Sequence, residues 1–232
     1  MATVVKILVK FIIPLLIAVL FSSCNYDINI SGAKGNGHVV TQKRLSDVVF
    51  SKIDASEGVD VYLTKSTSTA VKVQADDNIQ KLIITEIKNG TLFIHTSEAI
   101  GKTNAKKVLV NFVELNEINS SSGADIHTTN FIISDDIAIN ASSGSDQNLA
   151  VKATNIKCSA SSGADIHLNG STTFIIAEAS SGADIDAEEL ISKNCTVNAS
   201  SGADIDVTCT QLIDAIASSS ANVTYYGNPK NV

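Results

Sequence analysis

The segment SSGADIDAEELISKNCTVNASSGADI, residues 180–205, decides the fold, because the hexapeptide SSGADI both opens and closes it. The hexapeptide also occurs at 121–126 and 161–166, with a variant, SSGSDQ, at 142–147 and a degenerate copy, SSSANV, at 218–223. Successive copies begin 21, 19, 19, 20 and 18 residues apart. A fixed period near 20 residues is typical of a solenoid, in which each repeat packs only on its neighbours.

Apolar residues occupy alternate positions around each copy of the motif. Around Gly182, for example, they are Ile175, Ala177, Ala179 and Ile185. A period of two predicts strands. We therefore expect an all-β fold, a single-chain parallel β-helix (β-solenoid) with coils of about 20 residues. Its coils would stack ~4.8 Å apart around ladders of Ile and Ala.

The motif itself is expected to form the corner of each coil. Glycine adopts positive φ angles readily, and Ser and Asp side chains can bond to backbone amides that lack ladder partners. The last copy replaces Gly by Ser220 and Asp by Asn222, and Tyr225, Tyr226 and Pro229 follow it. Because an open solenoid end needs an atypical repeat to cover it, this region is expected to be a C-terminal cap.

The first 23 residues are of a different kind, with two lysines followed by the apolar run 11–21. This arrangement is typical of a secretory signal, and the run is shorter than the roughly 20 residues of a membrane span. The sequence LFSSC that ends the segment resembles a bacterial lipobox. We predict a lipoprotein signal peptide over residues 1–23, lipidation of Cys24, and a tether over residues 24–37. The alternative is an ordinary signal peptide with an incidental cysteine.

Residues 38–115 alternate in the same way but repeat less regularly than residues 116–232. The segment ASEGVD at 55–60 resembles the corner sequence ASSGAD, so earlier, degenerate coils are expected to begin near Gly58. The turn sequence at 88–90, Lys-Asn-Gly, indicates a hairpin or a coil corner. The prediction is one continuous solenoid, with a less regular N-terminal section and a regular repeat section that ends in the cap.

Three stretches together resemble a known family. They are GNGHVVTQKRLSDVVFSKIDASEGVDVYL at 35–63, the pattern D-N-x-x-x-x-I-x-T-x-I-x-x-G-x-L-x-I from Asp77, and the repeated SGADI corners. They are similar to the head GIN domain family, auto-transporter-adhesin-like proteins that are common as lipoproteins in the Bacteroidetes. The resemblance spans about residues 30–227. It implies a β-helical fold, an envelope location and an adhesion role, and no established catalytic residues. The family's usual corner resembles GSGDI, from which the Ser-Ser pair and the added Ala of this chain depart.

The composition restricts the function. The net charge of −7 argues against nucleic acid as a partner, because phosphate binding needs a basic face. The sequence contains no P-loop, GxGxxG, GxSxG or HExxH motif. The histidines are scattered, and His127 and His167 would lie two coils apart, about 10 Å, too far to share one metal. We expect no catalytic residues.

The predicted function is that of a lipid-anchored, non-enzymatic adhesion or scaffold module. It would lie in the bacterial cell envelope as an outer-membrane lipoprotein, periplasmic or surface-exposed, with the membrane and a glycan or protein ligand as partners. The alternative is a carbohydrate-binding or carbohydrate-cleaving β-helix, for which the Asp pairs of the last coils would be the candidate acids. Because these pairs recur as a repeat feature and lack neighbouring aromatic residues, a structural role is favoured.

An acidic ladder is expected along the outside of the corners. Residues 116–232 hold 14 acidic and four basic residues, and an Asp follows the motif's third residue by two positions in five copies. Carboxylates ~5 Å apart repel one another. Either corner amides bond each carboxylate, which is the favoured account, or Ca²⁺ lies between coils. The second account predicts a weak divalent-cation site at Asp184, Asp186, Asp204 and Asp206, and no other cofactor is expected.

Three cysteines remain after Cys24. Cys158 and Cys195 fall on inward positions, where we expect small buried hydrophobic residues, and Cys209 lies outside the shared apolar pattern. The odd number and the absence of a CxxC pair argue against a zinc site or a full disulfide framework. A bridge between Cys195 and Cys209 is left open by the sequence.

Overall fold

The structure is a computed structural model that describes residues 32–232, which form one unit. The expected signal peptide, Cys24 and the first part of the tether lie outside the described residues. The elements are β1 (Val39–Ser46), β2 (Lys52–Ala55), β3 (Asp60–Lys65), β4 (Ala70–Asp76), a 3₁₀ turn (Gln80–Leu82), β5 (Ile83–Lys88), β6 (Thr91–Thr96), β7 (Lys106–Phe112), β8 (Glu117–Ser120), β9 (Asp125–Thr128), β10 (Ile132–Ser142), β11 (Asp146–Ser161), β12 (Asp165–Ser180), β13 (Asp184–Ala199), β14 (Asp204–Ala217) and β15 (Asn222–Tyr226). The all-β prediction is confirmed.

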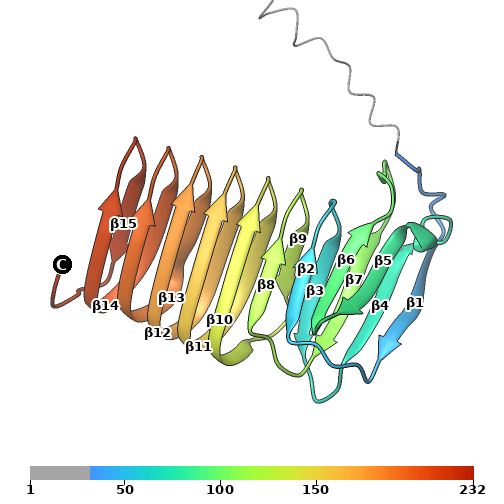
Figure 1. Ribbon diagram of the computed structural model, residues 1–232, viewed down its shortest axis with the longest axis horizontal. Coiled ribbons are helices and arrows are strands. Elements are labelled where there is room, and N and C mark those ends of the chain that lie inside the picture. Colours follow the sequence, from blue (N-terminus) through green and yellow to red (C-terminus); the bar gives the residue numbers. More distant parts are fainter. Residues whose placement is uncertain (1–31) are drawn as a thin grey trace, which may run out of the picture. The chain divides into compact units, whose positions relative to one another are not determined.

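The repeat section is the parallel solenoid that the spacing predicts (Figure 1). Strands β11 to β14 each run from one corner to the next, and β10 to β13 each pair in parallel with the strand of the following coil. Equivalent positions of the repeat are stacked, so that Ile185 pairs with Ile166 on one side and Ile205 on the other. The like-on-like stacking follows from the alternation, because a one-residue slip would turn every apolar side chain outward.

The corners use two consecutive residues with positive φ rather than one. At the corner of β12 and β13, Ser181 has φ 57° and Gly182 has φ 67°, and every SSGADI corner repeats this pair. A Cβ added to Gly182 would meet nothing within 4 Å, so the backbone conformation, not space, favours glycine there. The serine was not expected in this region, which L-residues adopt at a penalty. In the last corner Ser219 and Ser220 carry both positive φ angles.

The expectation that corner Ser and Gly amides bond each carboxylate of the acidic ladder is wrong, because these amides donate to backbone carbonyls; Asp184 instead accepts a hydrogen bond from the backbone of Asp204 in the next corner. The glycine N–H of each corner instead donates to the carbonyl of the second serine in the next corner, as Gly182 N does to Ser201 O at 3.1 Å. Backbone groups of neighbouring coils therefore satisfy one another around the corner as well as along the strands.

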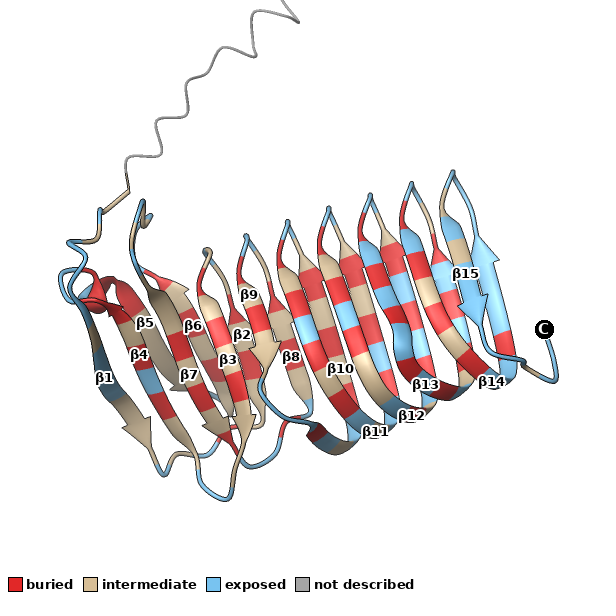
Figure 2. Cartoon of the chain, turned by 180° about the vertical axis from the view of Figure 1, so that it is seen from behind, coloured by how far each residue is buried: buried red, intermediate tan, exposed pale blue. Residues whose placement is uncertain are grey.

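The core consists of the inward positions that the alternation predicts (Figure 2). Ile166 and Ile185 are buried, whereas the outward Lys157 is exposed. In the SSGSDQ variant, the inward positions hold polar Ser145 and Gln147. Both are buried and bonded to Ser120, whose hydroxyl lies 2.9 Å from Ser145 Oγ and 2.7 Å from Gln147 Nε2. The irregular copy thus supplies a buried hydrogen-bonded cluster between the first two coils of the repeat section.

The N-terminal section continues the solenoid, but its coils are not in chain order. β2 pairs in parallel with β6 on one side and β8 on the other. β3 pairs in the same way with β7 and β9. The coil of β2 and β3 therefore lies between the coil of β6 and β7, which comes later in the chain, and that of β8 and β9. The Asp60 position stacks on Asp125, which confirms that the ASEGVD segment forms an early corner.

Antiparallel strands complete this section, so the parallel description applies to the coils alone. β4 pairs antiparallel with β7, and β1 with β4. β5 and β6 form a hairpin in which Lys88 pairs with Thr91. Its turn residues, Asn89 and Gly90, have φ 52° and 77°. The hairpin alternative for this turn sequence is confirmed.

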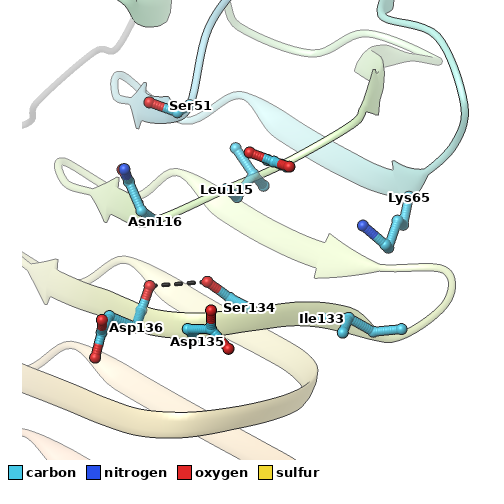
Figure 3. Close-up of a pocket in the computed structure, with 9 residues that line it drawn as sticks. Ser51, Lys65, Leu115, Asn116, Ile133, Ser134, Asp135 and Asp136 are labelled. Carbon is cyan, nitrogen blue, oxygen red and sulfur yellow. Dashed lines mark hydrogen bonds between the residues drawn. The ribbon is translucent and has the colours of Figure 1, made fainter.

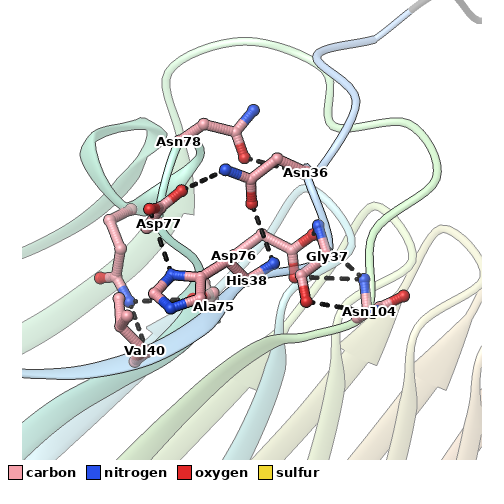
Figure 4. A network of polar contacts seen from close by, with 10 residues as sticks. Asn36, Gly37, His38, Val40, Ala75, Asp76, Asp77, Asn78 and Asn104 are labelled. Atoms are coloured by element: carbon pink, nitrogen blue, oxygen red, sulfur yellow. Dashed lines mark hydrogen bonds and ion pairs between the residues drawn. The ribbon is translucent and has the colours of Figure 1, made fainter.

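The last residues of the expected tether belong to the folded unit. Ala33 N donates to Ala99 O at 2.9 Å, and Gly37 N donates to the carboxylate of the buried Asp76 at 2.8 Å (Figure 4). Burial by itself raises the pKa of Asp76, but hydrogen bonds from Gly37, Asn104 and Thr103 outweigh it and lower the pKa. The tether over 24–37 is therefore too long as predicted, because residues 33–37 are fastened to the solenoid.

The C-terminal end carries only a thin cover. β15 adds a strand to β14, and Asn222 Nδ2 donates to Asp204 Oδ1 at 2.8 Å, which ends the acidic ladder. The tail then crosses over, and Lys230 N donates to Gln211 O at 2.8 Å. Tyr225 and Tyr226 remain exposed. Ala215 and Ala217, at inward positions, are also exposed because no coil follows them.

Candidate functional site

A cleft of about 500 Å³ opens where the two sections meet, and we call it the junction groove (Figure 3). Its lining comes from the loop before β2, the end of β3, the loop between β7 and β8, and the start of β10. These segments leave the regular coil path because the order of coils changes here. The residues that line it are Ser51, Lys65, Glu114, Leu115, Asn116, Ile133, Ser134, Asp135 and Asp136.

The groove is acidic, with one cation. Glu114, Asp135 and Asp136 line it together with Lys65, whose Nζ donates to Val113 O at 2.8 Å. Among the described residues Lys65 forms no ion pair. Ser134 Oγ donates to Asp136 O at 2.8 Å. Most of the carboxylate oxygens are thus free to accept hydrogen bonds from a ligand.

A second hollow of about 380 Å³ continues the groove along the outer face of the sheet. It shares Asn116 and Asp136 with the groove, and its lining includes Phe174 and Ile176, both more than 40% exposed. Asn155 Nδ2 donates to Asp136 Oδ1 at 2.6 Å beside the ring. An exposed aromatic ring next to convergent polar groups is typical of a ligand-binding surface.

The sequence analysis did not identify this groove. One signal was present, because Phe174 and Ile176 occupy outward positions that hold Asn155 and Lys157 in the preceding coil. Apolar residues at outward positions of a strand indicate a surface that binds a ligand or a partner. The loops that complete the groove carry no motif, and only the tertiary structure brings them together.

The acidic ladder is present and longer than predicted. Five Asp residues of the corners are stacked in register from Asp125 to Asp204, and Asp60 extends the row into the N-terminal section. Burial, followed by the charge of Asp165, raises the pKa of Asp184. Burial and the charge of Asp60 do the same for Asp125. The fold therefore holds these carboxylates against mutual repulsion.

The four residues of the predicted cation site lie together but do not form a preformed cage. Asp184 pairs with Asp204, and Asp186 with Asp206, on adjacent coils. Within residues 32–232, no group of three or more His, Cys, Asp or Glu side chains is arranged to hold a metal ion. Asn148 separates His127 from His167, as the two-coil spacing predicts. Weak calcium binding stays a prediction.

All three cysteines of the described residues are buried free thiols. Burial raises the pKa of Cys158 to about 12, so this thiol is unreactive at neutral pH. Cys158 and Cys195 occupy the inward positions predicted for them, and Cys209 is also buried. None of them lies in the junction groove.

Comparison with protein families accounts for most of the chain. The family described as "Putative auto-transporter adhesin, head GIN domain" matches residues 49–229, which include the junction groove and every coil. The chain belongs to the head GIN domain family. A comparison with curated proteins gives no match. Among residues 32–232, no helix has the length and apolar character to cross a membrane.

Solved structures of Bacteroidetes proteins share the fold of this head GIN domain protein. A "putative adhesin" from Bacteroides fragilis superposes with a TM-score of 0.75 at 21% identity, over 87% of this chain and 100% of its own. A "putative lipid binding protein" from Parabacteroides distasonis gives 0.68 at 19%, over 86% and 94%. A "putative adhesin" from Parabacteroides merdae gives 0.59 at 18%, over 86% and 98%. At these identities the likeness supports the fold alone.

Proposed function

We propose that this protein is a lipid-anchored, non-enzymatic adhesion module of the bacterial cell envelope and that its ligand binds in the junction groove. The observation that carries the proposal is the groove itself, an acidic cleft that continues into a surface with exposed Phe174 and Ile176. Family membership supports an adhesion-type role. A rigid solenoid suits such a role, because it presents a preformed surface with little ordering on binding.

The anchor in this proposal is Cys24, lipidated after removal of residues 1–23 in an outer-membrane lipoprotein. Because residues 33–37 are bonded to the N-terminal section, the lipid anchor would attach to that end of the solenoid. Cys24→Ser should abolish palmitate labelling and release the protein or leave it unprocessed. Unchanged labelling and fractionation of this variant would contradict the anchor.

Carbohydrate binding is the form of adhesion that the outer-face hollow favours. A sugar ring can stack on an exposed aromatic side chain, while hydroxyl groups donate to carboxylate and amide oxygens. Phe174, Asp136 and Asn155 supply these groups side by side. Peptide ligands are the competing class, since exposed Ile176 and Ile133 would contact apolar side chains equally well.

A glycan array probed with the purified protein tests this proposal. We expect binding to at least one glycan class, reduced at least tenfold by Phe174→Ala and by Asp136→Asn. Phe131→Ala is the matched control, because Phe131 is also exposed but lies under Lys152, outside both hollows. Equal loss in all three variants would remove the groove from the proposal. Polysaccharide turnover abolished by Asp184→Ala or Asp204→Ala would instead establish an enzyme.

A further inference from the structure

The two cysteines nearest the C-terminal end, Cys195 and Cys209, line the same bend of adjacent coils. Cys209 of β14 pairs with Ser192 of β13, and Cys195 follows Ser192 by three residues. Both thiols are buried. Because paired strands lie about 4.8 Å apart, the two side chains enter the core from neighbouring layers on the same side.

Each sulfur atom contacts a backbone carbonyl that lies close in sequence to the other cysteine. Cys209 Sγ lies 3.4 Å from the carbonyl oxygen of Lys193, two residues before Cys195. Cys195 Sγ lies 3.9 Å from the carbonyl oxygen of Thr208, directly before Cys209. Burial, followed by contact with the Cys209 thiol, raises the pKa of Cys195. Cys158 has no such partner, since the equivalent position of the next coil is Ala177.

We propose that Cys195 and Cys209 form a disulfide that joins the last two long strands, β13 and β14. The proposal rests on the export step of the proposed function, because disulfides persist in oxidising compartments. The oxidant is a disulfide, either of a thiol–disulfide exchange protein or of oxidised glutathione. One cysteine thiolate attacks it to form a mixed disulfide, and the other displaces the oxidant. One Sγ–Sγ bond forms, and two electrons and two protons pass to the oxidant, which leaves as thiols.

The position of the disulfide suits it to stabilise the C-terminal end of the solenoid. β14 has no long strand beyond it, so this end of the solenoid lacks the neighbour that stabilises every earlier coil. A covalent link between β13 and β14 compensates for that missing neighbour. The tail covers the bend, since the amides of Lys230 and Asn231 both donate to Gln211 O. Because thiolates are needed and the folded bend buries both thiols, oxidation precedes docking of the tail.

Refolding of the purified full chain in oxidised glutathione, followed by alkylation and trypsin digestion, tests the geometry. Cys195 and Cys209 share the tryptic peptide 194–230, and Cys158 lies alone in peptide 158–193. We expect peptide 194–230 to be unalkylated and two hydrogen atoms lighter than the dithiol, and peptide 158–193 to be alkylated. Full alkylation of peptide 194–230 would overturn the proposal.

Thermal melting and trapping in cells complete the test. Reduction should lower the melting temperature of the wild type and of Cys158→Ser by roughly 5–10 °C, and should not shift Cys195→Ser or Cys209→Ser. A bridge without this shift would overturn the stabilising role.

Protein trapped by acid and alkylation from cells should contain the bridge. If the protein from cells contains free thiols at Cys195 and Cys209 although refolding forms the bridge, the disulfide proposal fails in the cell. Palmitate labelling of Cys24 reports independently whether the export step of the proposed function has failed.

Discussion

The regular repeat section and the N-terminal section are built from the same coil but hold their cores in different ways. In the repeat section each coil stacks on the one before it in the chain, so register and burial repeat from β10 to β14. In the N-terminal section the coil of β2 and β3 lies between two coils that both follow it in the chain, and antiparallel strands cover the outer end of the section. The groove lies where these two arrangements meet.

The difference shows where a solenoid can vary. The repeat section has few free loops, because the glycine N–H of each corner donates to a backbone carbonyl of the next corner. A change in coil order requires longer connections, and these connections carry side chains that are free to contact a ligand. The repeat section therefore acts as a stiff extension, while the section boundary supplies the recognition surface.

The largest effect should come from a charge placed in the ladder of the repeat section. Ile185→Asp buries an unpaired carboxylate between two coils and should destabilise the protein by several kcal/mol. Lys157→Asp, on the exposed outward phase, should change stability by less than about 0.5 kcal/mol. Circular dichroism melts compare the two variants. Equal damage would show that the inward and outward phases are assigned wrongly.

The N-terminal section should instead depend on Asp76. Its pKa is lowered below the ordinary value of 3.8 by the hydrogen bonds that fasten residue Gly37 and the loop at Asn104. The stabilisation it contributes is present above 3.8 and is lost as the pH falls through the lowered pKa. Asp76→Asn should melt at a lower temperature than the wild type at pH 7. In acid the two proteins should melt at the same temperature.

The control for this variant is Asp214→Asn, an exposed carboxylate in the last coil. It should melt like the wild type at every pH. A difference between Asp76→Asn and the wild type that stays constant between pH 7 and pH 2 would show that packing, not the charge of Asp76, holds the N-terminal segment.

The corners allow a test with opposite signs at two equivalent positions. Gly182→Ala places an L-residue at φ 67° and should destabilise the protein by about 1–2 kcal/mol, although its Cβ meets nothing. Ser220→Gly removes the same strain at φ 62° and should stabilise the last coil by about 0.5–1 kcal/mol. Urea unfolding measures both. Two changes of the same sign would show that corner conformation does not limit stability.

The smallest effect should come from the acidic ladder. Because burial and neighbouring carboxylates raise the pKa of Asp184 above 3.8, its contribution to stability is most favourable below that pH and is lost as the pH rises through the raised pKa. Asp184→Asn should therefore melt slightly higher than the wild type at pH 7 and equally at pH 3. A lower melting temperature at pH 7 would contradict net repulsion in the ladder.

Calcium titration sharpens the same point. If the cluster of Asp184, Asp186, Asp204 and Asp206 binds divalent cations weakly, Ca²⁺ should raise the melting temperature in a saturable way. Sodium at matched ionic strength should not reproduce the shift, because simple screening is not specific for calcium. Absence of a calcium heat in calorimetry together with equal shifts from both salts would exclude the site.

The sequence by itself determined the coil, because its three signals are local. Alternation decides which side chains point inward, Gly182 and its equivalents mark the corners, and the spacing of the copies sets the coil length. These features led correctly to the stacked Ile and Ala ladders and to the acidic row. They also placed Cys158 and Cys195 in the core. The sequence did not reveal the left-handed conformation of the second corner serine, since glycine is the residue that adopts positive φ without a penalty.

Only the tertiary structure decided the order of coils in the N-terminal section, the junction groove, and the approach of Cys209 to Cys195. Each depends on which strands meet across long stretches of chain: β2 on β6 and β8, β3 on β7 and β9, and β14 on β13. A strand with alternating apolar residues can pair equally well with many others, because the pattern specifies a buried face but no partner. Partner choice is set by loop closure and by the fit of the whole core, which act between distant residues.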